Sequence, residues 1–190
     1  RPIQWLEDRQ ENMLAFHARG HTVDVEAAVK VDGTILGMKV YIMADLGAYF
    51  LSTTYIVPMH AGRRIAGPYK TPAMGVEVLG ALTNKPPTGP YRGAGGPESA
   101  YCMERTIDVI ARDLDLDPVA VRLRNFIPTD GFPHETPTGL TYDSGDYQHG
   151  LDRALELGDY RAWREKARQR GSEEPLIGVG LATVVKASGG

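Results

Sequence analysis

The chain has 190 residues, of which 42% are apolar and 24% charged, and its formal net charge is −3. These values are ordinary for a globular domain, and the charge offers no broad basic surface for nucleic acid or for an anionic membrane. A single cysteine excludes a disulfide framework within the chain and a multi-cysteine metal site, and no apolar run approaches the roughly 20 residues that a membrane span needs. We therefore expect a cytoplasmic protein that binds neither nucleic acid nor membrane.

Residues 1–85 are predicted to be mainly β. Apolar residues occupy every second position from Val23 to Val31, which is the period of a half-buried strand. Asp32-Gly33 is a hairpin turn signal, so this strand is expected to fold back onto a second one. Residues 45–72 hold several Gly and Pro and predict loops with at most one short helix. In chain order, the expected elements are a strand over 1–6, a helix over 9–15 capped by Asp8, strands over 22–32 and 35–44, and a strand over 75–83.

Residues 86–126 are predicted to form a loop rich in Gly and Pro, followed by two helices. Pro97 suits the first turn of the first helix, because proline lacks the N–H that would be left unpaired there. A second helix over 119–126 is expected to follow, with Asp117 as its cap. The apolar residues of the first helix recur at helical spacing and are Ala100, Met103, Ile107, Ile110 and Leu114.

Residues 127–190 are predicted to hold a polar loop, two helices and a terminal strand. The expected bounds are 128–146 for the loop, 148–158 and 160–170 for the helices, and 176–185 for the strand. Hairpins beside grouped helices argue for an α+β fold with mixed sheets rather than a doubly wound parallel sheet. The stretches 1–85, 86–126 and 127–190 are treated as parts of one 190-residue unit.

The stretch from Pro90 to Glu98 has the character of an anion-binding loop, because it places Arg92 and three glycines directly before a helix start. The start of a helix exposes unpaired N–H groups and partial positive charge, and glycine lets the backbone approach a ligand closely. Arg92 adds donors for a phosphate, carboxylate or oxo group. The spacing matches neither a dinucleotide fingerprint nor a Walker loop. The alternative is that the glycines only shape a turn and Arg92 pairs with a carboxylate.

Other side chains capable of chemistry form no familiar constellation. His17 and His21 are four residues apart, but Gly20 lies between them and no glutamate follows as in a metalloprotease. Exposed or loop histidines are therefore favoured over a metal site. His60 lies in a Pro/Gly-rich segment and either faces a pocket or makes a local hydrogen bond in a loop. Cys102 is expected to pack as a small buried side chain, and no acid–base pair or nucleophile motif stands out.

Many short segments match one protein family in the same order as in this chain. They are 1–5, 7–9, 12–14, 32–33, 44–49, 67–72, 83–87, 90–98, 104–105, 117–118, 122–126, 141–147 and 178–180. With these segments the chain resembles the large, molybdopterin-binding subunit of the xanthine dehydrogenase family, which includes aldehyde oxidases and carbon monoxide dehydrogenases. The Tyr91-Arg92-Gly93 motif falls on the Phe/Tyr-Arg-Gly loop of that family.

The resemblance implies an oxidoreductase that holds a molybdenum–molybdopterin cofactor and hydroxylates a heterocycle or aldehyde with oxygen from water. In such enzymes the cofactor performs the hard chemistry and the protein positions it, while electrons leave through iron–sulfur clusters and FAD on other domains or subunits. Carried onto this chain, Arg92 and the Tyr91 backbone contact the cofactor, and Gly93 and Ala94 line its site. The resemblance also implies a small-molecule substrate, an oligomeric complex with iron–sulfur and flavin subunits, and no direct metal ligand in this chain.

Departures from the subgroups of the family bear on the substrate. Xanthine oxidisers carry a phenylalanine at the position of Ala94 and a substrate-binding arginine near that of His60. His60 and Ala94 are therefore expected to line a substrate pocket that does not suit xanthine. Copper-containing carbon monoxide dehydrogenases carry a cysteine at the position of Gly93. The resemblance favours an aldehyde or a heterocycle other than a flat purine, although overall similarity to carbon monoxide dehydrogenase or aldehyde oxidase large chains is expected.

The chain is expected to be an internal piece of such a subunit. It begins at Arg1 without an initiator methionine and ends at 186–190, directly after a predicted strand. In the family, the catalytic glutamate lies far downstream and a Gly-Gly-Phe-Gly loop lies upstream, and neither has a match here. We expect no catalytic residue in this chain and no turnover by the chain alone. The alternative is a non-catalytic binding or interaction domain that kept the fold.

Overall fold

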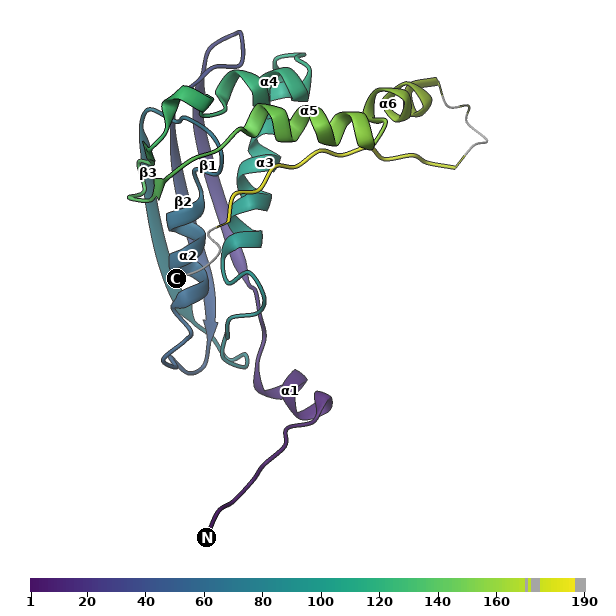
Figure 1. The fold of residues 1–190 in the computed structure, drawn as a ribbon. Helices are drawn as coiled ribbons and strands as arrows, with labels where there is room; N and C mark the ends of the chain where they lie inside the picture. Colours follow the sequence, from purple (N-terminus) through teal and green to yellow (C-terminus); the bar gives the residue numbers. More distant parts are fainter. Residues whose placement is uncertain (170, 172–174, 187–190) are drawn as a thin grey trace.

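The computed structural model describes residues 1–169, 171 and 175–186. Its centre is a three-stranded sheet in the order β1-β2-β3 (Figure 1), formed by His21–Val29, Ile35–Gly47 and Met74–Leu82. β1 pairs antiparallel with β2, and β3 pairs parallel with β2. A parallel pair requires a crossover, which helix α2 (Ile56–Arg64) provides. The predicted α+β class with mixed sheets is confirmed, although the sequence did not predict that β3 runs parallel to β2.

The predicted hairpin is confirmed, with a shorter first strand. β1 ends at Val29 rather than at residue 32 because a turn begins at Lys30. The Lys30 N–H donates to the Thr34 carbonyl, and the Gly33 N–H donates to the Lys30 carbonyl, both over 2.9 Å. Gly33 has a φ of +85°, which glycine adopts without a steric cost. β2 continues past the predicted end at residue 44 as far as Gly47.

One face of the sheet is covered by helices α2 and α3 (Gly96–Asp113), which lie side by side over the strands in Figure 1. Alternate residues of β2 point into this layer, whereas Lys39 and Met43 on the opposite face are exposed. The predicted apolar side of α3 is confirmed, because Met103, Ile107 and Ile110 are buried. The resulting core comprises Ile35, Met38, Val40, Ile42, Ala61, Ile65, Tyr69, Met103, Ile107, Ile110, Ala111, Val121, Phe126 and Leu151.

The segment before β1 projects from the body (Figure 1). Helix α1 spans Arg9–Ala15 as predicted, and a reciprocal pair of hydrogen bonds between Asp8 and Glu11 caps it. The predicted strand over 1–6 is wrong. Ile3 and Trp5 are 94% and 75% exposed, and neither described sheet includes this segment. Alternation of apolar residues makes no strand where there is no neighbouring strand to pair with.

Helix α4 (Pro118–Asn125) follows α3 and begins as predicted at Asp117, whose carboxylate accepts the Val119 N–H over 2.8 Å. Its buried residue Arg122 is fully enclosed and donates to Glu104 (2.9 Å) and to Asp108 (3.0 Å) of α3. Burial by itself lowers the pKa of the Arg122 guanidinium, but the nearby carboxylates, Glu104 above all, outweigh burial and hold that pKa above its usual value. The ion pair therefore fixes α4 against α3.

Helices α5 (Tyr147–Leu157) and α6 (Tyr160–Gln169) form an arm that extends sideways from the body, and the chain then runs back along this arm to α3 (Figure 1). Both predicted helices are confirmed, although residue 170, the predicted end of the second, lies outside the described residues. The predicted strand over 176–185 is wrong: the described residues alternate between half-buried and exposed, yet they join neither sheet. The backbone of this segment instead forms hydrogen bonds with side chains. The Leu181 carbonyl accepts from Arg122 (2.9 Å), and the Thr183 N–H donates to Glu104 (2.8 Å).

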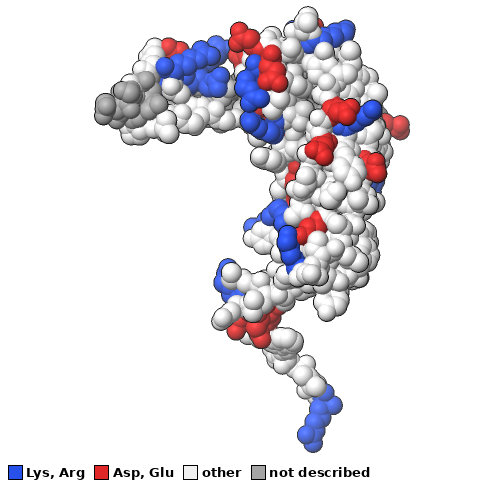
Figure 2. Space-filling view, turned by 180° about the vertical axis from the view of Figure 1, so that it is seen from behind, with Lys and Arg blue, Asp and Glu red and all other residues white. Residues whose placement is uncertain are grey.

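The predicted polar loop between α4 and α5 contains short elements of its own. They are a 3-10 turn at Thr129–Gly131 and a hairpin of β4 (His134–Glu135) and β5 (Thr141–Tyr142). Figure 2 shows charges of both signs scattered over the back of the body, with Lys and Arg gathered on the arm that carries α6. In the part of the chain that the structure describes, no helix is both long and apolar enough to cross a bilayer.

Candidate functional site

The loop between β3 and α3 has an uncommon backbone where it enters the helix. Gly93, Ala94 and Gly95 have φ angles of +99°, +37° and +89°. Glycine adopts positive φ freely, whereas alanine is strained there. Two hydrogen bonds close the loop, from the Ala94 N–H to the Tyr91 carbonyl (2.8 Å) and from the Gly96 N–H to the Gly93 carbonyl (2.9 Å). The loop is thus a defined turn rather than a loose connection.

Gly95 and Gly93 are also required by close packing. A Cβ atom at Gly95 would lie 2.4 Å from the Val57 carbonyl oxygen and 2.5 Å from the Ala61 nitrogen, both in the backbone of α2. A Cβ atom at Gly93 would lie 2.7 Å from Cδ of Pro97. These distances are far below normal contact, so the loop rests on α2 only because Gly95 has no side chain, and it folds against Pro97 of α3 only because Gly93 has none.

Three consecutive carbonyl oxygens of the loop are each held by a side chain from elsewhere in the chain. Arg19 Nη2 donates to the Arg92 carbonyl (3.2 Å), and Arg64 Nη1 donates to the Gly93 carbonyl (3.4 Å). Nδ1 of His60 lies 3.2 Å from the Ala94 carbonyl oxygen. In a trans peptide the N–H points opposite to the C=O. The Gly93 N–H therefore points away from Arg19, and no described residue accepts a hydrogen bond from it.

Tyr91 and Arg92 lie on the exposed side of this loop. The guanidinium of Arg19 stacks over the Tyr91 ring, 5.5 Å from its centroid, while 64% of Tyr91 remains exposed. The Arg92 side chain is exposed and makes no ion pair or hydrogen bond with any residue that the structure describes. The sequence alternative in which Arg92 pairs with a carboxylate is thus not what the structure has: Arg19, not Arg92, contacts Glu98.

His60 and Ala94, predicted to line a substrate pocket, are in direct contact. His60 is half-buried on α2, not in a loop, and its hydrogen bond to Ala94 spans 34 residues, so the local bond that the sequence suggested as an alternative is wrong. Arg64 follows His60 by one helical turn and reaches the adjacent carbonyl. Sequence reasoning missed Arg19 and Arg64. No local pattern could have found them, because α2 and the segment before β1 reach the loop only through the fold.

Comparison with known proteins identifies the family. Residues 1–126 match the molybdopterin cofactor-binding domain. The chain is 39% identical to the carbon monoxide dehydrogenase large chain of Hydrogenophaga pseudoflava, over 100% of this chain and 24% of that protein. This chain belongs to the molybdopterin cofactor-binding domain family. It spans about a quarter of the length of the curated relatives it matches.

Two further relatives of this molybdopterin-binding domain have different names. The nicotine 6-hydroxylase large subunit of Paenarthrobacter nicotinovorans is 32% identical over 99% of this chain and 23% of that protein. The crystal structure of quinoline 2-oxidoreductase from Pseudomonas putida 86 has a TM-score of 0.80 at 35% identity, over 87% of this chain and 21% of that chain. The fold is therefore that of a domain found in several molybdenum enzymes.

The residues of the loop fit an anionic cofactor that is rich in oxygen atoms. On the outer side of the loop, the Arg92 guanidinium and the Gly93 N–H are hydrogen-bond donors without an acceptor among the described residues. Donors of this kind suit phosphate and oxo groups, which accept hydrogen bonds and carry negative charge. The chemistry of these donors is therefore consistent with molybdopterin.

The other residues considered from the sequence form no metal site. His17 bridges to Thr88 and His21 opens β1, so they share no helix. Among the residues that the structure describes, no three His, Cys, Asp or Glu side chains come together as metal ligands. Cys102 is half-buried on α3, and burial raises the pKa of its thiol to about 11, which suits the predicted packing role.

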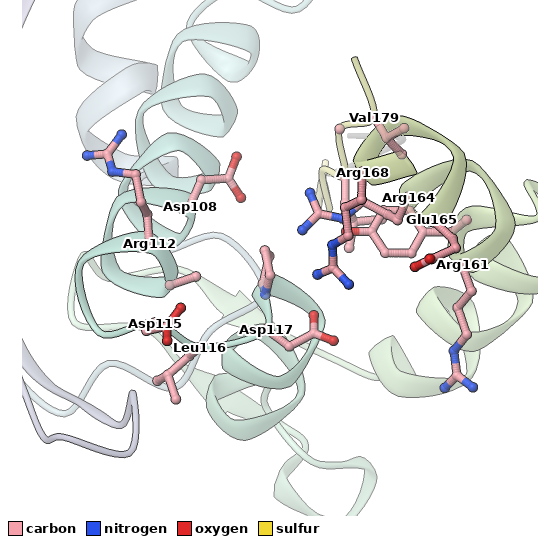
Figure 3. A pocket seen from close by; sticks show the side chains of 15 residues that line it. Asp108, Arg112, Asp115, Leu116, Asp117, Arg161, Arg164, Glu165, Arg168 and Val179 are labelled. Carbon is pink, nitrogen blue, oxygen red and sulfur yellow. The ribbon is translucent and has the colours of Figure 1, made fainter. Parts of the chain in front are cut away.

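One cavity of about 780 Å³ lies far from the loop in the sequence and the fold, between the corner of α3 and α4 and the arm that carries α6. Figure 3 shows Arg164 and Arg168 of α6 facing this corner, where Asp108, Asp115 and Asp117 lie. Charges of both signs line the cavity, so it has no clear preference for an anion or a cation. We do not assign it to the cofactor.

Proposed function

We propose that this chain is part of the large subunit of a molybdenum hydroxylase, which oxidises an aldehyde or a heterocycle with oxygen from water. In this proposal, Arg92, the Tyr91 backbone, Gly93 and Ala94 contact the molybdopterin cofactor. The cofactor would supply the redox chemistry, and the chain would bind and orient it. Relatives named carbon monoxide dehydrogenase, nicotine 6-hydroxylase and quinoline 2-oxidoreductase support an oxidoreductase of this kind.

The observation that carries the proposal is the arrangement of the loop from Tyr91 to Gly95. Arg19 holds the Arg92 carbonyl, and Arg64 and His60 of α2 hold the next two carbonyls, so the Gly93 N–H points away from Arg19. The Gly93 N–H and the Arg92 guanidinium have no acceptor among the described residues, and an anionic ligand would supply one. A loop that only connected β3 to α3 would not need three remote side chains to hold its carbonyls.

The residues at the loop favour a substrate other than xanthine. Ala94 occupies the position at which xanthine-oxidising members of the family that this chain resembles carry phenylalanine. His60 lies near the position of their substrate-binding arginine. Gly93 carries no thiol, so a copper-linked site of the carbon monoxide dehydrogenase type is not part of the proposal, despite the 39% identity to such a large chain. An aldehyde or a nitrogen heterocycle, as in the names of the nicotine and quinoline relatives, is the proposed substrate class.

The proposal includes partners outside this chain. The remainder of the large subunit would complete the cofactor site, and iron–sulfur and FAD-bearing domains or subunits would carry electrons away within a cytoplasmic oligomer. One relative is named as subunit gamma of a dehydrogenase complex, which supports a multi-subunit assembly. The 190-residue chain by itself is expected to turn over no substrate. Division of the chain at 85 and 126 remains a prediction.

Molybdenum analysis of the complete subunit tests the proposal, with Arg92→Ala as the test variant and Arg105→Ala as its control. Arg105 is also an exposed arginine, on α3, and makes no ion pair with a described residue. We expect about one molybdenum per chain in the parent and in Arg105→Ala, and a loss of metal or of turnover in Arg92→Ala of about tenfold or more. Equal metal and turnover in all three proteins would contradict the role of the loop. A folded parent without molybdenum, from a host that makes the cofactor, would instead favour a non-catalytic interaction domain.

A further inference from the structure

Arg19 connects three parts of the candidate site, although it lies more than 70 residues before them. Its Nε lies 2.8 Å from Oε1 of Glu98, its Nη2 donates to the Arg92 carbonyl over 3.2 Å, and its plane covers the Tyr91 ring. One guanidinium thus contacts a carboxylate, a backbone carbonyl and an aromatic face. Each of these three groups belongs to the loop or to the first turn of α3.

Glu98 explains why Arg19 occupies this place. Its side chain is only 9% exposed, and neither carboxylate oxygen receives a hydrogen bond from the described residues. A buried carboxylate needs a compensating charge, because removing it from water without one is costly. The start of α3 and the guanidinium of Arg19 supply that charge. Burial lowers the pKa of the neighbouring His21, so the His21 ring is neutral near pH 7 and does not compete for this role.

The contacts require an arginine rather than any cation. A guanidinium can place Nε in an ion pair with a carboxylate and donate from Nη2 to a carbonyl while its planar face covers a ring. A lysine ammonium could approach Glu98 but could not meet all three groups at once. Arg64 and His60 hold the next two carbonyls independently of Arg19. Loss of Arg19 would therefore free the Arg92 carbonyl while leaving the carbonyls of Tyr91, Gly93 and Ala94 with their hydrogen bonds.

We infer that Arg19, held in place by Glu98, is a positioning residue that fixes the Arg92–Gly93 peptide against the bound cofactor. This inference rests on the proposed function, because Arg92 and Gly93 are proposed cofactor contacts. Arg19 and Glu98 border a groove of about 510 Å³ between β1 and α3. A freed Arg92 carbonyl could turn toward water, which would rotate the Arg92–Gly93 peptide and with it the Gly93 N–H.

The test uses the complete, cofactor-loaded enzyme with Arg19→Ala, Arg19→Lys and Glu98→Gln. Arg105→Ala serves as the control, because Arg105 lines the same groove without contacting the loop. Each protein is reduced partially with dithionite, and its Mo(V) electron paramagnetic resonance spectrum is recorded beside its molybdenum content and its urea unfolding midpoint. Turnover is followed with benzaldehyde, nicotine and quinoline.

In Arg19→Ala we expect an altered Mo(V) spectrum and kcat lowered by about tenfold to a hundredfold, with a smaller change in KM. Its urea unfolding midpoint should also fall, because Glu98 loses its compensating charge, whereas Arg19→Lys keeps that charge and should keep a midpoint close to that of the parent. Arg19→Lys should restore part of kcat, and Glu98→Gln, which keeps the side-chain shape, should shift the spectrum in the same direction. Spectra and kcat equal to those of Arg105→Ala would overturn the inference. If Arg19→Ala does not fold, Arg19→Lys and Glu98→Gln decide between the same two results.

The outcome is separable from that of the proposed function. If Arg92→Ala retains molybdenum and turnover, the proposed role of the loop fails, whatever Arg19 does. If Arg92→Ala loses them while the Arg19 and Glu98 variants behave as Arg105→Ala does, only the positioning role of Arg19 is wrong.

Discussion

Arg122 and Arg92 show how differently this chain treats the same side chain. Arg122 has no exposed surface, and its guanidinium donates to Glu104, Asp108 and the carbonyls of Pro118 and Leu181. Arg92 is exposed and donates to no described residue, although the backbone beneath it is held rigidly. One arginine is satisfied entirely within the described chain, and the other faces solvent.

The difference teaches where stability and function lie in this domain. The network around Arg122 joins α3, α4 and the segment near Thr183, so its hydrogen bonds serve the fold. Burial, and then the Glu104 carboxylate, raise the pKa of the Tyr69 hydroxyl, so Tyr69 stays protonated and donates to Glu104. At the loop, positive φ angles and hydrogen bonds to the carbonyl oxygens of residues 92–94 constrain the backbone, but no described residue accepts a hydrogen bond from the Arg92 guanidinium. A backbone that is held in place beside hydrogen-bond donors without partners in the chain is expected at a binding site.

The largest expected effect is on the buried side of this comparison. Arg122→Met removes a buried charge and leaves Glu104 without its partner, which should lower the free energy of unfolding by about 3–5 kcal/mol. Arg92→Met removes an exposed side chain and should change it by less than about 0.5 kcal/mol. Urea unfolding of both variants and the parent measures the difference. Nearly equal losses in the two variants would show that the two arginines are not distinguished by burial.

The sequence predicted contiguous features well. The cap at Asp8, the turn at Asp32-Gly33 and the helix that begins at Gly96 are each encoded by neighbouring residues, so local rules suffice. The loop from Tyr91 to Gly95 could be singled out for the same reason. Local sequence could not show that Arg122 would be buried and Arg92 exposed, since burial depends on which elements pack against each side chain.

Features that depend on a distant partner could not be predicted. Alternation near Trp5 and near Thr183 suggested strands, but alternation records only which side chains can be buried and not whether another strand is adjacent. The convergence of Arg19, Arg64 and His60 on successive carbonyls likewise requires α2 and the segment before β1 to lie against the loop. The apolar pattern of α3 predicted which side is buried, but not which helix packs beside the loop.

A smaller effect is expected at the loop, where shape rather than charge is tested. Gly95→Ala adds a Cβ atom 2.4 Å from the Val57 carbonyl oxygen at a φ of +89°. Strain and the forced displacement from α2 should lower the free energy of unfolding by about 1–3 kcal/mol. In the complete enzyme the same change should also reduce molybdenum content, because the loop moves as a unit.

Gly75→Ala provides the matched control for this substitution. Gly75 lies in β3, where an added Cβ atom would meet nothing within 4 Å. Alanine there should change the free energy of unfolding by less than about 0.5 kcal/mol and leave the metal content unchanged. If Gly95→Ala behaved as Gly75→Ala does, the close approach of the loop to α2 would not be what specifies its conformation.

Asp45 stands between the two extremes and should give the smallest effect, with a dependence on pH. Its carboxylate accepts from Lys85 (2.6 Å), Thr83 (2.5 Å) and the Gly47 N–H (3.0 Å), and these contacts, led by Lys85, hold its pKa well below the usual value. A lowered pKa means that the carboxylate stabilises the fold above about pH 4 and that this contribution is lost as the pH falls further. Asp45→Asn should therefore cost about 1 kcal/mol at pH 7 and less at pH 3, measured by urea unfolding.

Glu26→Gln, which disrupts an exposed contact of 3.9 Å with Lys39, should cost almost nothing at either pH. A free-energy penalty for Asp45→Asn that is the same at both pH values would mean that the amide changes packing rather than charge. The stabilising charge contacts within the described chain would then be those of Arg122 and its partners.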